Sequence, residues 1–305
     1  MNAYVGITDY EWYGLLRDSM PISEVNFWQP GGKRRFQALN EGELFLFKLH
    51  SPNDFIVGGG LFAHSSLLPV SLAWDAFGES NGVSSMTEMR ARIERYRSAP
   101  ADPLDDYTIG CIILTQPFYF DRSRWIPIPS DWDRHTVQGK RYDLTQGNGR
   151  TLFDSVQDAV RSLPDSVVSD QLKKYGDPVL VKPRLGQGAF RLVVTDAYDR
   201  RCSLSGEKVL PVLEAAHIRP YSRGGEHHVN NGILLRSDLH VLFDRGYITV
   251  ARSNNLEVSR RLREEFENGR DYYALHGRTL RAPLQAVNRP LIENLTWHND
   301  NVYRG

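Results

Sequence analysis

The first 145 residues contain short hydrophobic runs of the length and composition that favour β-strands. Apolar, aromatic and β-branched side chains fill these runs, which are residues 4–7, 43–49, 55–62 and 107–114. Within residues 87–98, Met89, Ile93 and Tyr96 recur instead at helical spacing, with arginines on the other face. This pattern predicts a small β-barrel or curled sheet interrupted by one helix.

The second half of the chain shows a mixed pattern. An apolar helical face over residues 190–198 comes first, and two short strand-like runs follow at residues 213–218 and 232–235. Ser237 is a suitable N-cap and Gly246 a suitable terminating residue for a helix directly after the second run. The predicted order is strand, loop, strand and helix, so the chain is expected to belong to the α+β class.

The chain has 305 residues, which at roughly 150 residues per domain corresponds to two domains. Polar, glycine-bearing sequence near residue 145 and a helical pattern ending at Pro164 suggest where they divide. The sequence predicts a first domain over residues 1–145, a linker helix within 146–178 and a second domain over 179–305.

The formal net charge is zero, but the two halves differ in sign. Residues 1–178 carry 18 Lys and Arg against 23 Asp and Glu, whereas residues 179–305 carry 19 against 14. The C-terminal half is therefore the part that favours phosphates, although its net charge of +5 is also ordinary for a domain of this size.

Hydropathy and cysteine content limit the cellular setting. No run approaches the ~18 apolar residues of a membrane span, and the first 30 residues lack the pattern of a signal peptide. Cys111 and Cys202 lie far apart, so no disulfide framework is expected. A cytoplasmic protein without membrane contact fits these observations.

Four polar residues of the strand–loop–strand–helix segment are predicted to meet. His217 lies near the end of the first strand, Asn231 enters the second, and His240 and Asp244 share one helix face one turn apart. An imidazole and a carboxylate at this spacing can bind one divalent metal ion, while the facing strand directs His217 at a nearby water molecule. Asn231 would fix the loop or orient the imidazole. Each residue alone also fits an ordinary surface group, but the combination indicates a hydrolytic site.

Three blocks of this segment resemble the HNH (ββα-metal) endonuclease motif. They are EAAHIRP at residues 214–220, VNNGILL at 229–235 and DLHVLFDRG at 238–246. The resemblance implies a DNA phosphodiester hydrolase with His217 as general base, Asn231 as structural asparagine and His240 as a metal ligand. The implied cofactor is a divalent metal ion, Mg²⁺ first, with Mn²⁺, Ni²⁺ and Zn²⁺ as alternatives.

Two positions depart from the family pattern. Ala216 stands where many HNH sites have a metal ligand immediately before the base. The resemblance therefore leaves Asp244 and Glu214 as the further ligands, with a plain salt bridge as the alternative for Glu214. Cys202 has no second cysteine three positions later, so we expect it to lie in the core and not to bind zinc.

The partner implied by this resemblance is double-stranded DNA. Five arginines flank the blocks and are candidates for phosphate contacts, namely Arg184, Arg191, Arg219, Arg223 and Arg245. One ββα site acts on one strand at a time, so a double-strand break requires a homodimer or two sites acting in succession.

The N-terminal half resembles the PUA superfamily, which includes EVE, ASCH and YTH domains. The resemblance rests on GELFLFK at residues 42–48 and FIVGGGL at residues 55–61. It implies a PUA-like β-barrel whose pocket stacks a flipped or modified base against aromatic rings. The implied pocket walls and edge-reading residues are Trp28, Trp74, Trp125, Asn26 and Asp75. For each tryptophan, a place in the core is the alternative.

The two resemblances together favour a modification-dependent restriction endonuclease, in which the first domain selects modified bases in foreign DNA and the HNH domain cuts. One alternative is an HNH nickase or repair-type nuclease that acts on unmodified DNA. The other is a catalytically silent reader of modified bases, which Ala216 permits. The presence of His217, Asn231 and His240 together argues against the silent reader.

Overall fold

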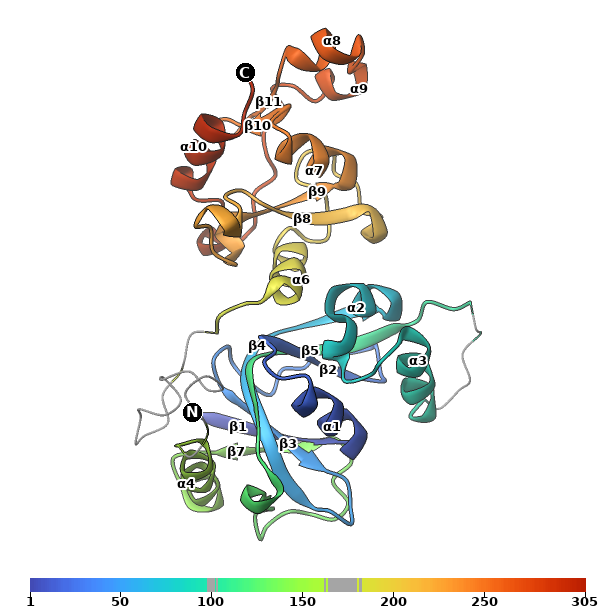
Figure 1. The fold of residues 1–305 in the computed structure, drawn as a ribbon, viewed down its shortest axis with the longest axis vertical. Helices are drawn as coiled ribbons and strands as arrows, with labels where there is room; N and C mark the ends of the chain where they lie inside the picture. The colour runs from blue at the N-terminus through green and yellow to red at the C-terminus, as the bar shows by residue number, and fades with distance from the viewer. Residues whose placement is uncertain (98–101, 103, 162, 164–179, 181–182) are drawn as a thin grey trace. The chain divides into compact units, whose positions relative to one another are not determined.

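The computed structural model describes residues 1–97, 102, 104–161, 163, 180 and 183–305. The chain divides into two compact units, Met1–Ala189 and Phe190–Gly305 (Figure 1). Residues 162 and 164–178 of the predicted linker lie outside the described residues. Every helix among the described residues is too short or too polar to span a membrane.

A seven-stranded mixed sheet forms the first unit. Its strands are β1 (Asn2–Thr8), β2 (Glu24–Gln29), β3 (Leu44–Leu49), β4 (Phe55–Pro69), β5 (Thr108–Tyr119), β6 (Ile126–Pro127) and β7 (Gly139–Asp143). The order is β2-β5-β4-β3-β1-β7, with β6 paired to β4. Strands β1 and β3 run parallel and the other neighbours antiparallel. Among the described residues β2 and β7 do not pair with each other, so the α+β class is confirmed but the predicted β-barrel is not closed.

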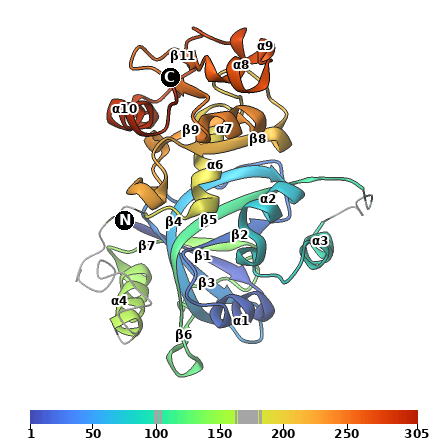
Figure 2. The same cartoon turned by 45° about the horizontal axis from the view of Figure 1, so that its top comes forward.

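Strand β3 is buried on both faces, which explains its continuous hydrophobic run. Leu44 and Leu46 lie in a core that helix α4 (Gly147–Arg161) covers. Phe45 and Phe47 lie in the opposite core, against helix α1 (Tyr10–Asp18). Figure 2 shows α1 and α4 on different sides of the sheet. Helix α4 is therefore part of the core of the first unit, whereas the sequence pattern placed it in a linker.

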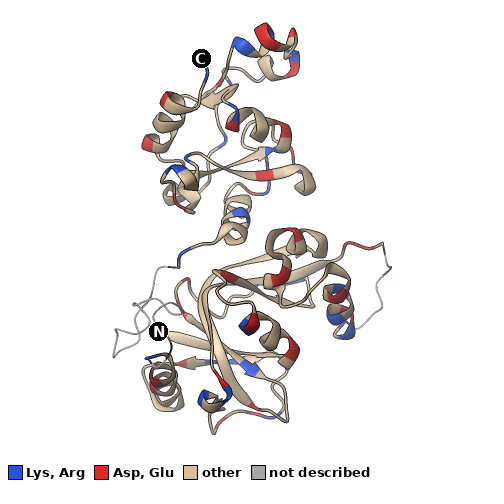
Figure 3. Ribbon diagram, viewed as in Figure 1, with Lys and Arg blue, Asp and Glu red and all other residues tan. Residues whose placement is uncertain are grey.

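Three consecutive glycines in β4 allow the sheet to pack closely. A Cβ atom on Gly58 would lie 2.3 Å from the carbonyl oxygen of Phe118 on β5, which no side chain tolerates. The register of β4 against β5 shifts between Gly59 and Leu61, as expected at a β-bulge. The central strands of this unit are largely free of charge in Figure 3, and charged residues gather on helices and loops.

Helices α2 (Val70–Phe77) and α3 (Met86–Arg95) follow β4. Helix α3 confirms the helix predicted in residues 87–98, and it buries Met89 and Ile93. Tyr96 lies just past its end and is 52% exposed, so it does not continue the apolar face.

The second unit is built around an antiparallel pair of strands and a helix. These are β8 (Leu213–His217), β9 (Gly232–Arg236) and α7 (Ser237–Asp244), and helix α6 (Gln187–Ala197) leads into them. The remaining elements are β10 (Ile248–Val250), β11 (Leu256–Val258), α8 (Arg261–Phe266), α9 (Arg270–Tyr273) and α10 (Ile292–Asn301). The predicted order of strand, loop, strand and helix is confirmed.

His298 on α10 anchors the end of α7. Its Nε2 donates to the carbonyl oxygen of Phe243 at 3.1 Å, and its Nδ1 lies 2.8 Å from the hydroxyl of Thr249. The imidazole also stacks on the Phe243 ring, with 3.7 Å between centroids. Burial lowers the pKa of His298 to about 4, so this residue is a neutral structural group at pH 7.

Candidate functional site

The β8–β9 pair and α7 bring the predicted hydrolytic residues to one side of the second unit. His217 ends β8 opposite Gly232, and α7 begins directly after β9. A Cβ on Gly232 would lie 2.5 Å from Val194 of α6, so only glycine lets α6 pack on the strand here. Helix α7 ends at Asp244, and Gly246 follows in a left-handed conformation with φ of 76°.

His217 contacts two aromatic groups. The ring of Phe190 stacks on its imidazole with centroids 3.9 Å apart and planes 10° apart. At the edge of the imidazole, Nε2 lies 2.9 Å from Nδ1 of His227. Burial, followed by the nearby charges of His227 and His240, lowers the pKa of His217 to about 4. The imidazole is therefore neutral at pH 7, which is the form that can accept a proton.

His240 lies between two carboxylates. Its Nδ1 is 2.6 Å from Oε2 of Glu214 on β8, and its Nε2 is 3.3 Å from Oδ2 of Asp244 one helical turn later. Partial burial and the like charge of Glu214 raise the pKa of Asp244, while His240 opposes this shift. The predicted face of α7 is thus occupied by an imidazole with an acidic group at each nitrogen.

His240, Glu214 and Asp244 are the candidate ligands of a metal ion. No three His, Cys, Asp or Glu side chains in the described residues are arranged to hold a metal ion. The donor types nevertheless fit a divalent ion, which His240 Nε2 and Asp244 would hold. A metal-bound histidine commonly donates its other N–H to a carboxylate, and Glu214 has that position at Nδ1. The position of Glu214 therefore fits the role of orienting His240 better than it fits the predicted role of a metal ligand.

Asn231 is buried and clamps the loop between β8 and β9. Its Oδ1 accepts from the backbone N–H of Arg219 at 3.0 Å, and its Nδ2 donates to the carbonyl oxygens of Arg219 and Glu226, both at 2.9 Å. A Cβ on Gly225 would lie 1.9 Å from the Arg219 carbonyl oxygen, so the loop closes tightly at that glycine. The sequence suggested that Asn231 either fixes the loop or orients the imidazole of His217, and these contacts fit the first role.

Residues 201–251 match the family model of HNH endonucleases. The predicted HNH resemblance of the C-terminal half is thereby confirmed.

Two solved structures are similar to the chain. The crystal structure of an ASCH protein from Zymomonas mobilis is similar over 50% of this chain and 94% of that chain, with 11% identity and a TM-score of 0.34. The modification-dependent TagI restriction endonuclease is similar over 97% of this chain and 81% of that chain, with 14% identity and a TM-score of 0.28. No curated protein matches the chain.

The five candidate DNA-binding arginines differ in their surroundings. Arg219 packs over the ring of Trp297 at 5.5 Å and donates from Nε to the carbonyl oxygen of Arg223. Arg223 is exposed in the loop between β8 and β9, Arg245 is exposed directly after Asp244, and Arg191 is half-buried on α6. Arg184 belongs to the first unit, where it is exposed. Four of the five therefore lie in the unit that holds His217.

Cys202 is buried, as expected for a core residue. Its Sγ accepts from the backbone N–H groups of Ser205 and Arg236, at 3.4 and 3.3 Å. The thiol therefore joins the segment before β8 to the end of β9.

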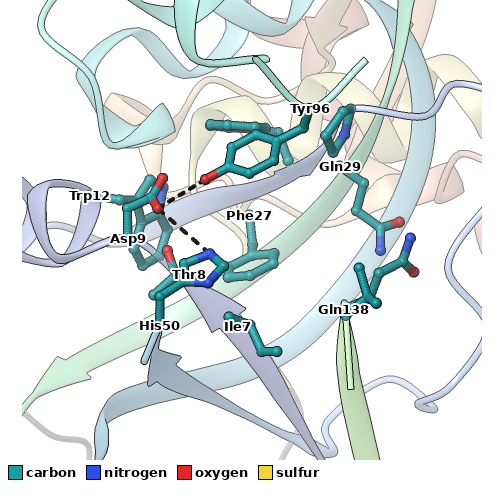
Figure 4. A pocket seen from close by; sticks show the side chains of 12 residues that line it. Ile7, Thr8, Asp9, Trp12, Phe27, Gln29, His50, Tyr96 and Gln138 are labelled. Carbon is teal, nitrogen blue, oxygen red and sulfur yellow. Dashed lines mark hydrogen bonds and ion pairs between the residues drawn. The ribbon is translucent and has the colours of Figure 1, made fainter. Parts of the chain in front are cut away.

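The first unit contains a cavity of about 210 Å³. Asp9 lies at its edge, where Oδ1 accepts from the Tyr96 hydroxyl at 3.1 Å and lies 3.6 Å from Nε2 of His50 (Figure 4). The rings of His50 and Tyr96 are parallel within 4°, with centroids 6.5 Å apart. The other lining residues are Ile7, Thr8, Trp12, Phe27, Trp28, Gln29, Pro30, Val137 and Gln138. Pockets for drug-sized ligands measure roughly 300–1,000 Å³, so this one suits a single planar ring system.

Trp28 is the one predicted pocket residue that lines this cavity. Asn26 on β2 is fully buried, and its Nδ2 donates to Oδ1 of Asn81 at 2.8 Å. Trp125 packs against both cores and donates from Nε1 to the Phe120 carbonyl oxygen. Trp74 and Asp75 lie on α2, away from the cavity lining.

Sequence reasoning did not identify Asp9, His50 or Tyr96 as pocket residues, nor His227 as a neighbour of His217. Asp9 follows β1 directly and His50 follows β3 directly, and these strands are parallel neighbours. Polar residues at the ends of adjacent parallel strands meet at one sheet edge, and the pairing of β1 with β3 is the signal that was needed.

Proposed function

We propose that this protein is a metal-dependent endonuclease that hydrolyses phosphodiester bonds in double-stranded DNA carrying modified bases. The observation that carries the proposal is a neutral His217 on the same ββα scaffold as the carboxylate-flanked His240, within the segment that matches HNH endonucleases. Phe190 stacks on the His217 ring, and the clamped loop holds the residues that follow it. Arg219 and Arg223 in that loop and Arg245 after α7 supply positive charge on this unit.

The chain's own groups divide the reaction between them. His217 accepts a proton from the water molecule that attacks the phosphorus, and it can do so because it is uncharged at pH 7. Glu214 holds the His240 ring, and His240 with Asp244 forms the donor set for the ion. When bound there, a divalent ion supplies positive charge that polarises the phosphoryl oxygen and stabilises the leaving oxygen.

The pocket of the first unit supports base selection. A base turned out of the duplex needs a slot with aromatic faces and a few polar groups at its edge. The parallel His50 and Tyr96 rings, with centroids 6.5 Å apart, supply aromatic surface to this pocket. The Asp9 carboxylate at the edge can accept a hydrogen bond from an exocyclic amino group, which cytosine and adenine carry.

Cleavage of matched DNA duplexes tests this function. The substrates are one sequence prepared unmodified, with 5-methylcytosine, with 5-hydroxymethylcytosine and with N6-methyladenine, each incubated with Mg²⁺ or Mn²⁺ and then with chelator. We expect metal-dependent cutting that prefers one modified duplex. His217→Ala should reduce the rate by about 10²–10⁴-fold, while the control His135→Ala, at an exposed position of the first unit, should not.

The reader pocket requires its own variants. Tyr96→Leu should lower the preference for the modified duplex without changing the maximal rate. Tyr10→Leu is the control, because Tyr10 is exposed to a similar extent, 54% against 52%, and does not line the cavity. Equal cutting of all duplexes by the wild type would refute base selection and leave a plain nuclease. No cutting with any of these metals would refute the nuclease.

A further inference from the structure

His227 contacts the proposed general base but takes no part in the proposed reaction. It lies in the loop between β8 and β9, ten residues after His217 in the sequence. Its Nδ1 is 2.9 Å from Nε2 of His217, and the two rings meet edge to face at 5.0 Å with planes 66° apart. This distance and arrangement are those of a hydrogen bond between two imidazoles.

The loop holds His227 firmly in this position. Tyr221 stacks on its ring with centroids 4.8 Å apart and planes 9° apart. The carbonyl oxygen of the preceding residue, Glu226, accepts a hydrogen bond from the buried Asn231 amide. The same asparagine binds both backbone polar groups of Arg219, two residues after His217. One buried side chain thus fixes both ends of the His217–His227 contact.

A hydrogen bond between two neutral imidazoles has two proton arrangements. In the first, Nδ1–H of His227 donates to Nε2 of His217. His217 then carries its own proton on Nδ1, and its lone pair is consumed, so it cannot take a proton from water. In the second, Nε2–H of His217 donates to Nδ1 of His227. The Nδ1 lone pair of His217 then stays free, and only this arrangement leaves a competent base.

We propose that His227 is the positioning residue that accepts the Nε2–H of His217 and thereby keeps Nδ1 of His217 as the proton acceptor. This role rests on the proposed function of His217. In the reaction, one O–H bond of the attacking water breaks and its proton binds Nδ1, which makes His217 an imidazolium. The Nε2–H donor then becomes charged, and its hydrogen bond to His227 strengthens in the transition state. His227 thus stabilises the charge on His217 without exchanging a proton.

Substitutions at His227 distinguish the effect of its hydrogen-bond acceptor from the effect of its size. His227→Asn keeps an acceptor oxygen near the position of Nδ1, and His227→Leu keeps apolar bulk without an acceptor. The control is His228→Asn, because the neighbouring His228 pairs with Glu226 and not with His217. We expect kcat to fall on the order of 10–100-fold in His227→Leu, with KM for DNA unchanged. His227→Asn should recover most of the loss, and His228→Asn should cut like the wild type.

A direct measurement of the tautomer complements the kinetics. Long-range ¹H–¹⁵N correlation spectra of the full chain report which nitrogen of each histidine carries a proton, and the His217→Ala variant assigns the signals. At pH 7 without metal, we expect His217 protonated on Nε2 in the wild type and in His227→Asn. In His227→Leu we expect a mixture of both tautomers. This readout does not depend on DNA cleavage.

The outcomes distinguish this inference from the function on which it rests. A wild type that cuts no DNA refutes the proposed function, whatever the tautomer. An active wild type with the proton on Nδ1 of His217, or a fully active His227→Leu, refutes the role of His227 alone. Loss of Mn²⁺ binding in both His227 variants, measured by calorimetry, would also overturn the inference, because it would make His227 a metal ligand.

Discussion

Replacement of Asn231 by alanine should loosen the loop between β8 and β9 without unfolding the second unit. The substitution removes three hydrogen bonds, two to Arg219 and one to Glu226. At about 0.5–1.5 kcal/mol for each bond, the expected loss of stability is about 3 kcal/mol. Because Glu226 precedes His227, the loop should release the contact with His217, and the cleavage rate should fall together with the local stability.

Amide hydrogen exchange in β8 and β9 measures this loss. The backbone N–H of Ile218 donates to the Asn231 carbonyl oxygen at 2.9 Å, so its exchange rate reports the closure of the loop. Asn230→Ala is the matched control, because Asn230 provides a backbone carbonyl oxygen to Leu291 that alanine retains. The reasoning is refuted if Asn231→Ala protects the Ile218 amide as well as the wild type and cuts DNA at the same rate.

Three further predictions concern protons and metal. Because the pKa of His217 is about 4, kcat at saturating metal should stay level from pH 7.5 to about pH 5; a decline that begins near pH 6.5 would contradict this. The folded pKa of His298, about 4, lies below its ordinary value of 6.5, so the free energy of unfolding should be fully retained above pH 6.5 and decrease by about 3 kcal/mol towards pH 4. His298→Gln should show a weaker pH dependence in urea titrations, and an unchanged slope would count against the assignment. Calorimetry should find no Mn²⁺ binding in His240→Ala and about 10–100-fold weaker binding in Glu214→Gln, whereas equal affinities would disprove this donor set.

The order of strand, loop, strand and helix could be predicted because its signals are local. Two short apolar runs indicated β8 and β9, and Gly246 marked the end of α7 to within two residues. His240 and Asp244 meet because residues four apart on a helix always do. The role of Glu214 could not be predicted from the sequence. It depends on which nitrogen of His240 the Glu214 carboxylate contacts, and only the structure shows that this is Nδ1.

The pocket of the first unit depends on contacts that sequence patterns do not encode. Its residues come from the ends of β1 and β3, from β2 and from the end of α3, which lie far apart in the chain. Tyr96 fits the helical period of Met89 and Ile93, yet the helix ends one residue before it and leaves the ring at the cavity. Of the three tryptophans predicted as pocket walls, Trp28 lines the cavity and Trp74 and Trp125 do not, and sequence alone does not separate them because aromatic residues serve cores and pockets equally.

The burial of β3 on both faces determines how this unit can diverge between relatives. Most strands have one face in solvent, so every second position accepts polar substitutions. Leu44, Phe45, Leu46, Phe47 and Leu49 have no such face, since each is at most 3% exposed. A saturation library of the chain should therefore show a continuous block of intolerance here, without the alternation seen along an ordinary strand. Variation in the pocket must then come from residues that follow the strands, such as Asp9 and His50, because their side chains can change without disturbing either core.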